Sequence, residues 1–286
     1  MVAATTGFSM MHVAIRYISA DLHPFQIMFF RNFFGLIIFI PLIWRSGLGT
    51  FRTKRLPVHL LRAGLNVMAM GLYFTALSLT PVAQVTALGF TAPLFAGVLS
   101  AVVLGEQFRL RRWMAIILGF VGALVILRPG FQELDLGSTF ALIASLIWGV
   151  TLIVIRVLGR TESSATTTIY MSVLLSALSF IPALIVWQTP TVTTFMLLIL
   201  LAVVGTAAQL GLAQALKEAD AMTVMPFDFT KLIWAALLGY LIFAEVPDIF
   251  IWIGGTIIFS SGIYLAYREN KIGKSRPIEP AGPPGA

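Results

Sequence analysis

Long apolar segments separated by short connections make up almost the whole chain. A helix needs ~20 predominantly apolar residues to span a bilayer, and an average soluble protein is ~25% charged. Here 58% of the 286 residues are hydrophobic and only 11% are charged. The sequence therefore predicts an all-α integral membrane protein with little length left for a soluble domain. We expect ten transmembrane helices, at residues 1–18, 24–44, 58–78, 82–104, 113–127, 137–158, 165–187, 191–215, 221–244 and 249–267.

The basic residues follow the ends of these segments, as topology signals do, so the net charge of +7 does not indicate a nucleic-acid partner. If both termini are cytoplasmic, fifteen lysines and arginines, Arg62 among them, fall inside, and Arg16 and Arg128 fall outside. We therefore predict a multi-pass protein of the bacterial inner membrane, with residues 269–286 as a disordered cytoplasmic tail. The first apolar segment begins at Met1 without a basic lead, so it is not a cleavable signal, and we expect a late start codon or a trimmed end.

An internal repeat divides the chain into two halves. Moving residues 72–127 by 139 positions places them on residues 211–266 without a gap. The matched pairs include Glu106 with Glu245, Trp113 with Trp252, and Phe120 with Phe259. We therefore expect five-helix repeats at 1–130 and 131–268. Because five is odd, the two repeats must face opposite ways across the membrane. Inverted repeats of this kind are the architecture of secondary transporters, whose substrate site lies near the bilayer midplane between the halves.

The apolar stretch Pro226–Glu245 carries two charges, Asp228 and Lys231, well inside a predicted span. A charge near the bilayer centre costs from ~3 to more than 10 kcal/mol, and residues three apart share one helix face. The two side chains could form a self-neutralising pair that only stabilises the helix, but we favour a role in a substrate cavity. Asp228 is the one acid inside a predicted span, so we expect it to carry any coupling of transport to protons.

Further polar and aromatic residues are candidates for the same cavity. Arg31 could reach the outer headgroups, or it could bind an anionic substrate group or pair with Asp228. Gln84 lies on the first-half twin of the charged helix, and an intramembrane amide of this kind otherwise makes an interhelical hydrogen bond. Aromatic rings could stack on a planar ligand or simply pack. These are Tyr73, Trp148 and Phe229.

Two acids at helix ends are candidates for gates. Glu106 and Glu245 end predicted helices, where the helix dipole disfavours an acid, so we expect a basic partner for each. The predicted topology places Arg128 beside Glu245 outside and Arg268 beside Glu106 inside, with the basic run 109–112 as a competing partner for Glu106.

The residues give no support to a metal or cofactor site. The chain has no cysteine, and its three histidines, His12, His23 and His59, lie far apart in sequence. An intramembrane enzyme would need a further polar cluster, and a channel would need rings of repeated charge. We therefore expect a transporter and keep channel and enzyme as remote alternatives.

Four stretches in order resemble the drug/metabolite transporter superfamily, and within it the EamA-type ten-helix group. They are HPFQIMFFRNFFG at 23–35, TALSLTPVAQVTALGFTAPLFAGVLSAVVLGE at 75–106, RRWMAIILGFVGALVILRPG at 111–130 and FAEVPD at 243–248. The resemblance covers about residues 1–268.

This resemblance implies alternating access, with helices one to four and six to nine around a central cavity. The fifth and tenth helices would be peripheral and could form a homodimer contact. The chain looks most similar to uptake members that handle riboflavin or S-adenosylmethionine. The alternative is an exporter of amino acids or drug-like metabolites.

Overall fold

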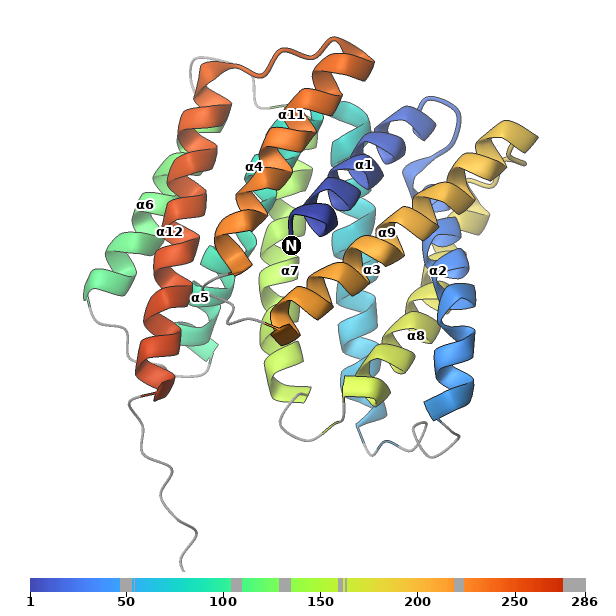
Figure 1. The fold of residues 1–286 in the computed structure, drawn as a ribbon, viewed down its shortest axis with the longest axis horizontal. Coiled ribbons are helices and arrows are strands. Elements are labelled where there is room, and N and C mark those ends of the chain that lie inside the picture. The colour runs from blue at the N-terminus through green and yellow to red at the C-terminus, as the bar shows by residue number, and fades with distance from the viewer. Residues whose placement is uncertain are drawn as a thin grey trace, which may run out of the picture.

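All regular structure in the described part of the chain is helical (Figure 1). The computed structural model describes residues 1–46, 53, 55–103, 110–128, 135–158, 162, 164–218 and 224–274. The elements are α1 (Val2–Ile18), α2 (Pro24–Ser46), α3 (Leu56–Leu79), α4 (Val82–Gly89), α5 (Ala92–Val103), α6 (Leu110–Leu127), α7 (Leu136–Leu158), α8 (Ser164–Ile185), α9 (Val192–Glu218), the 3₁₀ helix η2 (Met225–Phe229), α11 (Thr230–Phe243) and α12 (Ile249–Lys274). Each predicted span coincides with one helix or with two consecutive helices.

Two of the predicted spans are interrupted rather than continuous. Residues 82–103 form α4 and α5, which are separated at Phe90 and Thr91 by short-range bonds to the carbonyls of Ala87 and Leu88. Pro93 then lies in the first turn of α5, where a missing N–H costs least. The second interrupted span is the one that carries Asp228 and Lys231. It contains the 3₁₀ turn of η2, which includes Pro226. Interruptions of this type place backbone polar groups inside the bundle.

The predicted disordered tail begins too early. Residues 269–274 continue α12 to Lys274, because Glu269, Lys271 and Lys274 are good helix formers and no proline occurs before Pro277. Residues 275–286 lie outside the described part of the chain.

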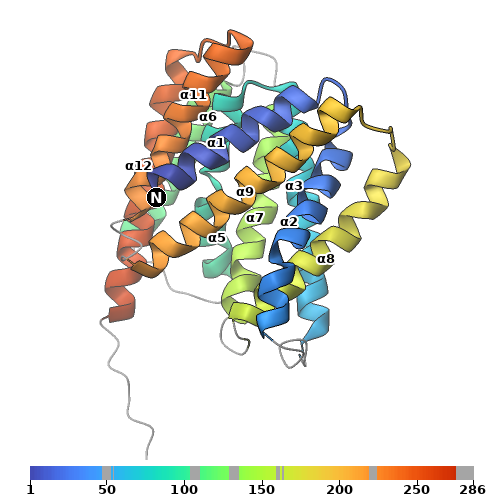
Figure 2. The same cartoon turned by 45° about the vertical axis from the view of Figure 1, so that its right-hand side comes forward.

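The helices pack in pairs that join the two halves of the sequence. In both Figures 1 and 2, α1 lies beside α9, α6 and α12 lie at one side, and α2 and α8 lie at the other. The further close pairs are α3 with α7, α5 with α7, α1 with α11, and α4 with α11. The first half therefore packs on the second along the whole bundle.

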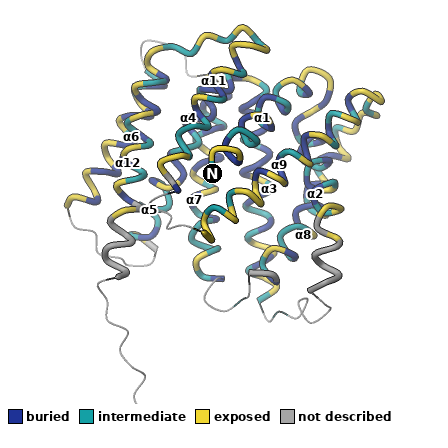
Figure 3. Tube along the Cα trace, viewed as in Figure 1, coloured by how far each residue is buried: buried dark blue, intermediate teal, exposed yellow. Residues whose placement is uncertain are grey.

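Apolar residues remain exposed on the outer faces of the bundle (Figure 3), for example Ile117, Leu118 and Leu124 of α6. Within the described residues, seven helical segments are long and apolar enough to cross a membrane, and Pro24–Ile38 and Ile249–Leu265 are shorter apolar helices. The helical segments with sufficient length are Leu56–Leu79, Val82–Val102, Leu110–Leu127, Leu136–Leu158, Thr166–Ile185, Val192–Glu218 and Pro226–Phe243. An apolar outer face on such helices is suited to lipid contact.

Glycines allow the closest contacts between helices, as small residues do in membranes. A Cβ at Gly122 on α6 would lie 2.8 Å from the carbonyl oxygen of Gly254 on α12. A Cβ at Gly254 would clash in turn with the Gly122 carbonyl and would lie 2.6 Å from Ile126. The α6–α12 pair therefore depends on the absence of a side chain at both positions.

We expect Gly254→Ala to lower the free energy of unfolding by about 1–3 kcal/mol, because the added methyl meets backbone that must move. Thermal unfolding in detergent measures the loss. Gly262→Ala on the same helix is the control, since a Cβ there meets nothing within 4 Å. Equal stability of the two variants would contradict the packing argument.

Candidate functional site

Asp228 and Lys231 form an ion pair at the junction of η2 and α11. The Lys231 Nζ lies 2.8 Å from Asp228 Oδ2, and the two side chains are only 20% and 18% exposed. Lys231 follows Asp228 by three positions, so the helical turn places both side chains on one face. The Lys231 ammonium also lies 5.4 Å from the ring centre of Phe8 and 5.8 Å from that of Phe90, distances that allow cation–π attraction. The pair thus neutralises two charges in an apolar surrounding.

Helix α1 supports this ion pair from the other half of the chain. The Ser9 hydroxyl donates to the Lys231 carbonyl at 2.9 Å, and the hydroxyls of Thr5 and Thr230 lie 2.6 Å apart. Ser9 and Thr5 are both fully buried. The ion pair therefore lies where the first and second halves meet, as expected for a site between two halves.

Phe229 and Tyr73 lie close to this ion pair, and both are packed among other rings. Phe229 lies 4.8 Å from Phe259 and stacks on Phe90 at 6.3 Å. Tyr73 packs on His12 of α1 at 5.3 Å. The structure therefore brings Asp228, Lys231, Phe229 and Tyr73 into one region. Trp148 is 41% exposed on α7 and lines neither cavity described below.

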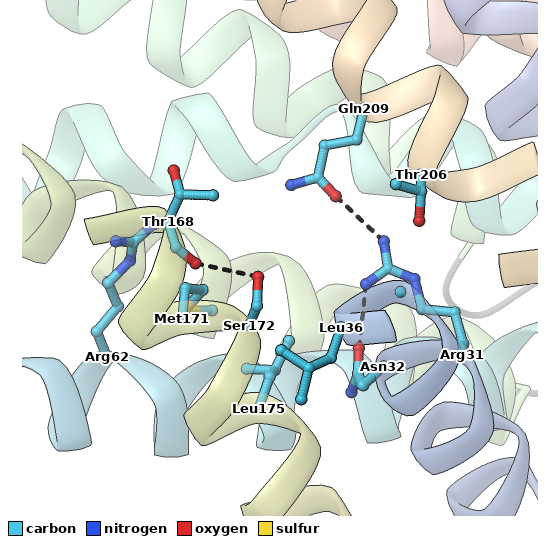
Figure 4. A pocket seen from close by; sticks show the side chains of 11 residues that line it. Arg31, Asn32, Leu36, Arg62, Thr168, Met171, Ser172, Leu175, Thr206 and Gln209 are labelled. Carbon is cyan, nitrogen blue, oxygen red and sulfur yellow. Dashed lines mark hydrogen bonds between the residues drawn. The ribbon is translucent and has the colours of Figure 1, made fainter. Parts of the chain in front are cut away.

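Arg31 lies elsewhere, in a cavity of about 100 Å³ bounded by α2, α3, α8 and α9 (Figure 4). Its Nη1 donates to Asn32 Oδ1 at 3.0 Å and its Nη2 to Gln209 Oε1 at 3.3 Å. Of the roles left open for Arg31, pairing with Asp228 is not what the structure shows, because the guanidinium is held by neighbouring amides and Asp228 is paired within its own turn. Arg62 lines the same cavity. The sequence interpretation missed it by treating it as a topology signal, although its position inside a predicted span could have identified it.

Gln84 lies in a second cavity, of about 200 Å³, together with Arg128, Glu245 and Asp248. Its side-chain amide donates to the Ser138 hydroxyl at 2.8 Å. Gln84 is thus a cavity residue that also joins α4 to α7. The four residues that were expected to share one midplane cavity are distributed over three places.

The gate pairing predicted for Glu245 is also wrong. Glu245 Oε1 lies 2.6 Å from Arg16 Nη2, and Arg128 Nη2 lies 2.5 Å from Asp248 Oδ2. Arg128 and Glu245 do line one cavity, but each has another partner. Glu106 lies outside the described part of the chain, as does the side chain of Arg268, so the Glu106–Arg268 pair stays a prediction.

Backbone geometry explains this exchange of partners. Ala244 adopts a left-handed conformation at φ 55°, as residues at helix C-termini often do, and the Glu245 N–H bonds back to the Gly239 carbonyl at 3.2 Å. This turn directs Glu245 toward α4, where its Oε2 accepts the Val82 N–H at 3.1 Å. An acid is favourable there, because the first N–H groups of a helix lack intrahelical partners.

Asp248 meanwhile caps α12 and pairs with Arg128. Its Oδ1 accepts the N–H of Phe250 at 3.2 Å, the geometry of an N-cap. The hydrogen bonds from Phe250 and from Arg128 hold the pKa of Asp248 below its ordinary value. The Arg128 guanidinium also lies over the Phe250 ring at 4.4 Å.

Arg16 is the residue of this region whose role the sequence did not reveal. Its Nη1 donates to the carbonyls of Leu77 at 3.0 Å and Thr80 at 2.8 Å, where α3 ends. One guanidinium therefore bonds the last carbonyls of α3 and the carboxylate that covers the start of α4. Its one signal in the sequence is that a shift of 140 positions, close to that of the repeat, matches Arg16 with Arg156.

A neighbouring cap joins the same helix end to α7. The side chain of Asp135 accepts the N–H groups of Gly137 at 3.2 Å and Ser138 at 3.1 Å. It also accepts the hydroxyl of Thr80. Burial raises the pKa of Asp135, but these hydrogen bonds outweigh burial and hold it below the ordinary value. The ends of α3, α4, α7 and α12 are thus all satisfied around one end of the bundle.

Comparison with known proteins identifies the class of protein to which this chain belongs. The chain is a multi-pass helical membrane protein, and the model of the EamA-like transporter family matches residues 1–128 and 135–268. The chain belongs to the EamA-like transporter family, and it is a transporter and not an enzyme.

Three relatives show the range of substrates. The riboflavin transporter of Vibrio cholerae is 32% identical over 96% of this chain and 94% of its own. The S-adenosylmethionine uptake transporter of Rickettsia bellii is 30% identical over 91% of this chain and 89% of its own. The pseudopaline exporter of Pseudomonas aeruginosa is 24% identical over 93% and 94%. A solved crystal structure shares the fold, with a TM-score of 0.59 and 18% identity over 96% of this chain and 99% of the other.

We expect Glu245→Gln to lower the free energy of unfolding by about 1–3 kcal/mol, because Arg16 loses its charged partner at a partly buried position. Chemical unfolding in detergent measures the change. Glu218→Gln on α9, whose carboxylate is exposed, is the matched control. An equal effect of both substitutions would contradict the role assigned to Glu245.

Proposed function

We propose that this chain is a secondary transporter that carries a small organic metabolite into the cell across the bacterial inner membrane. The observation that carries the proposal is the Asp228–Lys231 pair, held between α1 of the first half and α11 of the second. Charged residues inside membrane helices usually belong to a transport path. The uptake activity named for two relatives supports the inward direction, whereas the exporter relative supports the alternative of outward transport.

We infer that transport works by rocking two inverted five-helix repeats, at residues 1–130 and 131–268. The helix contacts support this inference, because they occur in matched sets. Helix α1 packs on α9 and α11, and α7 packs on α3 and α5, which is the set obtained by exchanging the halves. The double match of the family model is in accord with it. The positive-inside pattern supports a cytoplasmic position for both termini.

The aromatic residues around the ion pair make a vitamin or nucleoside-like substrate the best candidate. Phe8, Phe90 and Phe229 surround the pair, and such rings can stack on a flat heterocycle. Riboflavin and S-adenosylmethionine both contain one. A homodimer through α6 and α12 stays a prediction.

Purified protein in liposomes tests the proposal. Radiolabelled riboflavin and S-adenosylmethionine are offered outside, with the unlabelled compound inside. A transporter accumulates label by exchange and saturates, whereas a channel does neither. Absence of exchange for both compounds and for a panel of amino acids would overturn the proposal.

We expect Asp228→Asn to abolish accumulation driven by a pH gradient while exchange continues. The amide cannot take up and release a proton, but it keeps the size of the side chain. Asp21→Asn, in the connection between α1 and α2, controls for the loss of one carboxylate. Full accumulation by Asp228→Asn under a pH gradient would refute proton coupling through this residue.

A further inference from the structure

The cavity between α2, α3, α8 and α9 contains two arginines and no acid. Arg31 enters it from α2 and Arg62 from α3, and no described residue that lines it is acidic. The other polar lining residues are neutral and include Thr168, Ser172, Thr206 and Gln209. Figure 4 shows the two guanidinium groups on opposite sides, with Ser172 between them and Gln209 directed toward Arg31. Two positive charges thus face a small space from both sides.

Neutral groups hold Arg31 in this space. Its two hydrogen-bond acceptors among the described residues are the side-chain oxygens of Asn32 and Gln209. These amides orient the guanidinium, but they do not compensate its charge. Asp228, the acid considered as a partner for Arg31, is bound to Lys231.

In the described part of the chain, the guanidinium of Arg62 has fewer hydrogen-bond partners than that of Arg31. Its Nε and Nη1 are buried, and they have no hydrogen-bond partner among the described residues. Buried polar atoms in proteins are almost always hydrogen-bonded, and a buried donor without a partner costs ~1–3 kcal/mol, more for a charged group. Because Arg62 lines the cavity, a ligand there that supplies acceptor atoms would account for these unpaired donors.

The size of the cavity limits what it can hold. A water molecule takes a share of ~30 Å³ in the liquid, and whole-ligand pockets run to ~300–1,000 Å³. A space of about 100 Å³ therefore accommodates one carboxylate or phosphate group and not a whole vitamin or nucleoside. Carboxylate and phosphate groups both pair with the forked donors of arginine through two parallel hydrogen bonds.

We propose that this cavity binds the anionic group of the transported metabolite, a carboxylate or a phosphate, between Arg62 and Arg31. The hydroxyl of Ser172, which donates to the Thr168 carbonyl at 3.0 Å, lies between the two arginines. That the bound metabolite is transported rests on the proposed function, whereas the binding of an anion in this cavity does not. It favours S-adenosylmethionine, which has a carboxylate, or a phosphorylated metabolite over riboflavin, which has no anionic group.

Thermal unfolding of the purified full-length protein tests the anion site directly. Sodium acetate and inorganic phosphate are titrated separately, with chloride as the balancing anion at constant ionic strength. We expect saturable stabilisation of the wild type by at least one of the two anions, and the stronger one identifies the class. Arg62→Gln and Arg31→Gln should each weaken the apparent affinity at least tenfold. Arg111→Gln, at the exposed start of α6, should leave it unchanged.

The stability of the variants without anion is a second measurement. Arg62→Gln removes a buried charge without a described partner, so it should unfold at the same temperature as the wild type or higher. Marked destabilisation by Arg62→Gln would show that its charge is already compensated in the protein and would overturn the proposal. If neither acetate nor phosphate stabilises the wild type, the proposal is also overturned.

Competition in liposomes separates this inference from the proposed function. Decarboxylated S-adenosylmethionine has the same nucleoside and sulfonium but no carboxylate, so we expect it to compete at least tenfold more weakly than S-adenosylmethionine. Equal competition, or riboflavin as the preferred substrate, would overturn the inference while the transporter stands. Anion stabilisation that depends on both arginines, without transport of any compound, would uphold the site and reject the proposed function.

Discussion

A charge inside an apolar helix bundle costs free energy unless it is paired, and the pairing of such charges determines how α1 meets α11. The Asp228–Lys231 pair and the Arg16–Glu245 pair lie at the two ends of the η2–α11 segment. Both are in contact with α1, through the hydroxyl of Ser9 at one end and Arg16 itself at the other. Helix α1 therefore joins the first half to the second by polar contacts, in a surrounding where each such contact lacks competition from water.

Helix ends are what make these contacts available. A continuous membrane helix satisfies its own backbone and offers nothing to a partner. The start of α4 exposes N–H groups that Glu245 can cover, and the end of α3 exposes carbonyls that Arg16 can bond. The 3₁₀ turn of η2 ends next to Asp228, so the ion pair also lies at a break in regular structure. Helix ends inside a bundle are a recurrent location of transport sites.

The distribution of charge is uneven between the two cavities. Around Gln84, Arg128 has Asp248 and Arg16 has Glu245, so the cations near that cavity are neutralised. Around Arg31 and Arg62, the lining residues that the structure describes supply no acid. The first arrangement resembles a closure made of ion pairs, and the second resembles a site prepared for an anion. Relatives with such different substrates as riboflavin and pseudopaline indicate that side chains, and not the fold, select the ligand.

The sequence alone determined the helical segments, the membrane class and the location of the charged pair, because apolar length and local spacing are properties of consecutive residues. The Asp228–Lys231 contact follows from a separation of three residues on one helical turn. Partners across the bundle could not be obtained in this way. Glu245 pairs with Arg16 because a left-handed residue at Ala244 turns the chain toward α4. Asp248 forms the ion pair with Arg128 because it lies at the cap of the next helix. Arg62 looked like a topology signal until the packing of α3 against α8 placed it in a cavity. Those outcomes depend on helix breaks, tilts and caps, which the tertiary structure decides by satisfying buried polar groups over distances that the linear pattern does not encode.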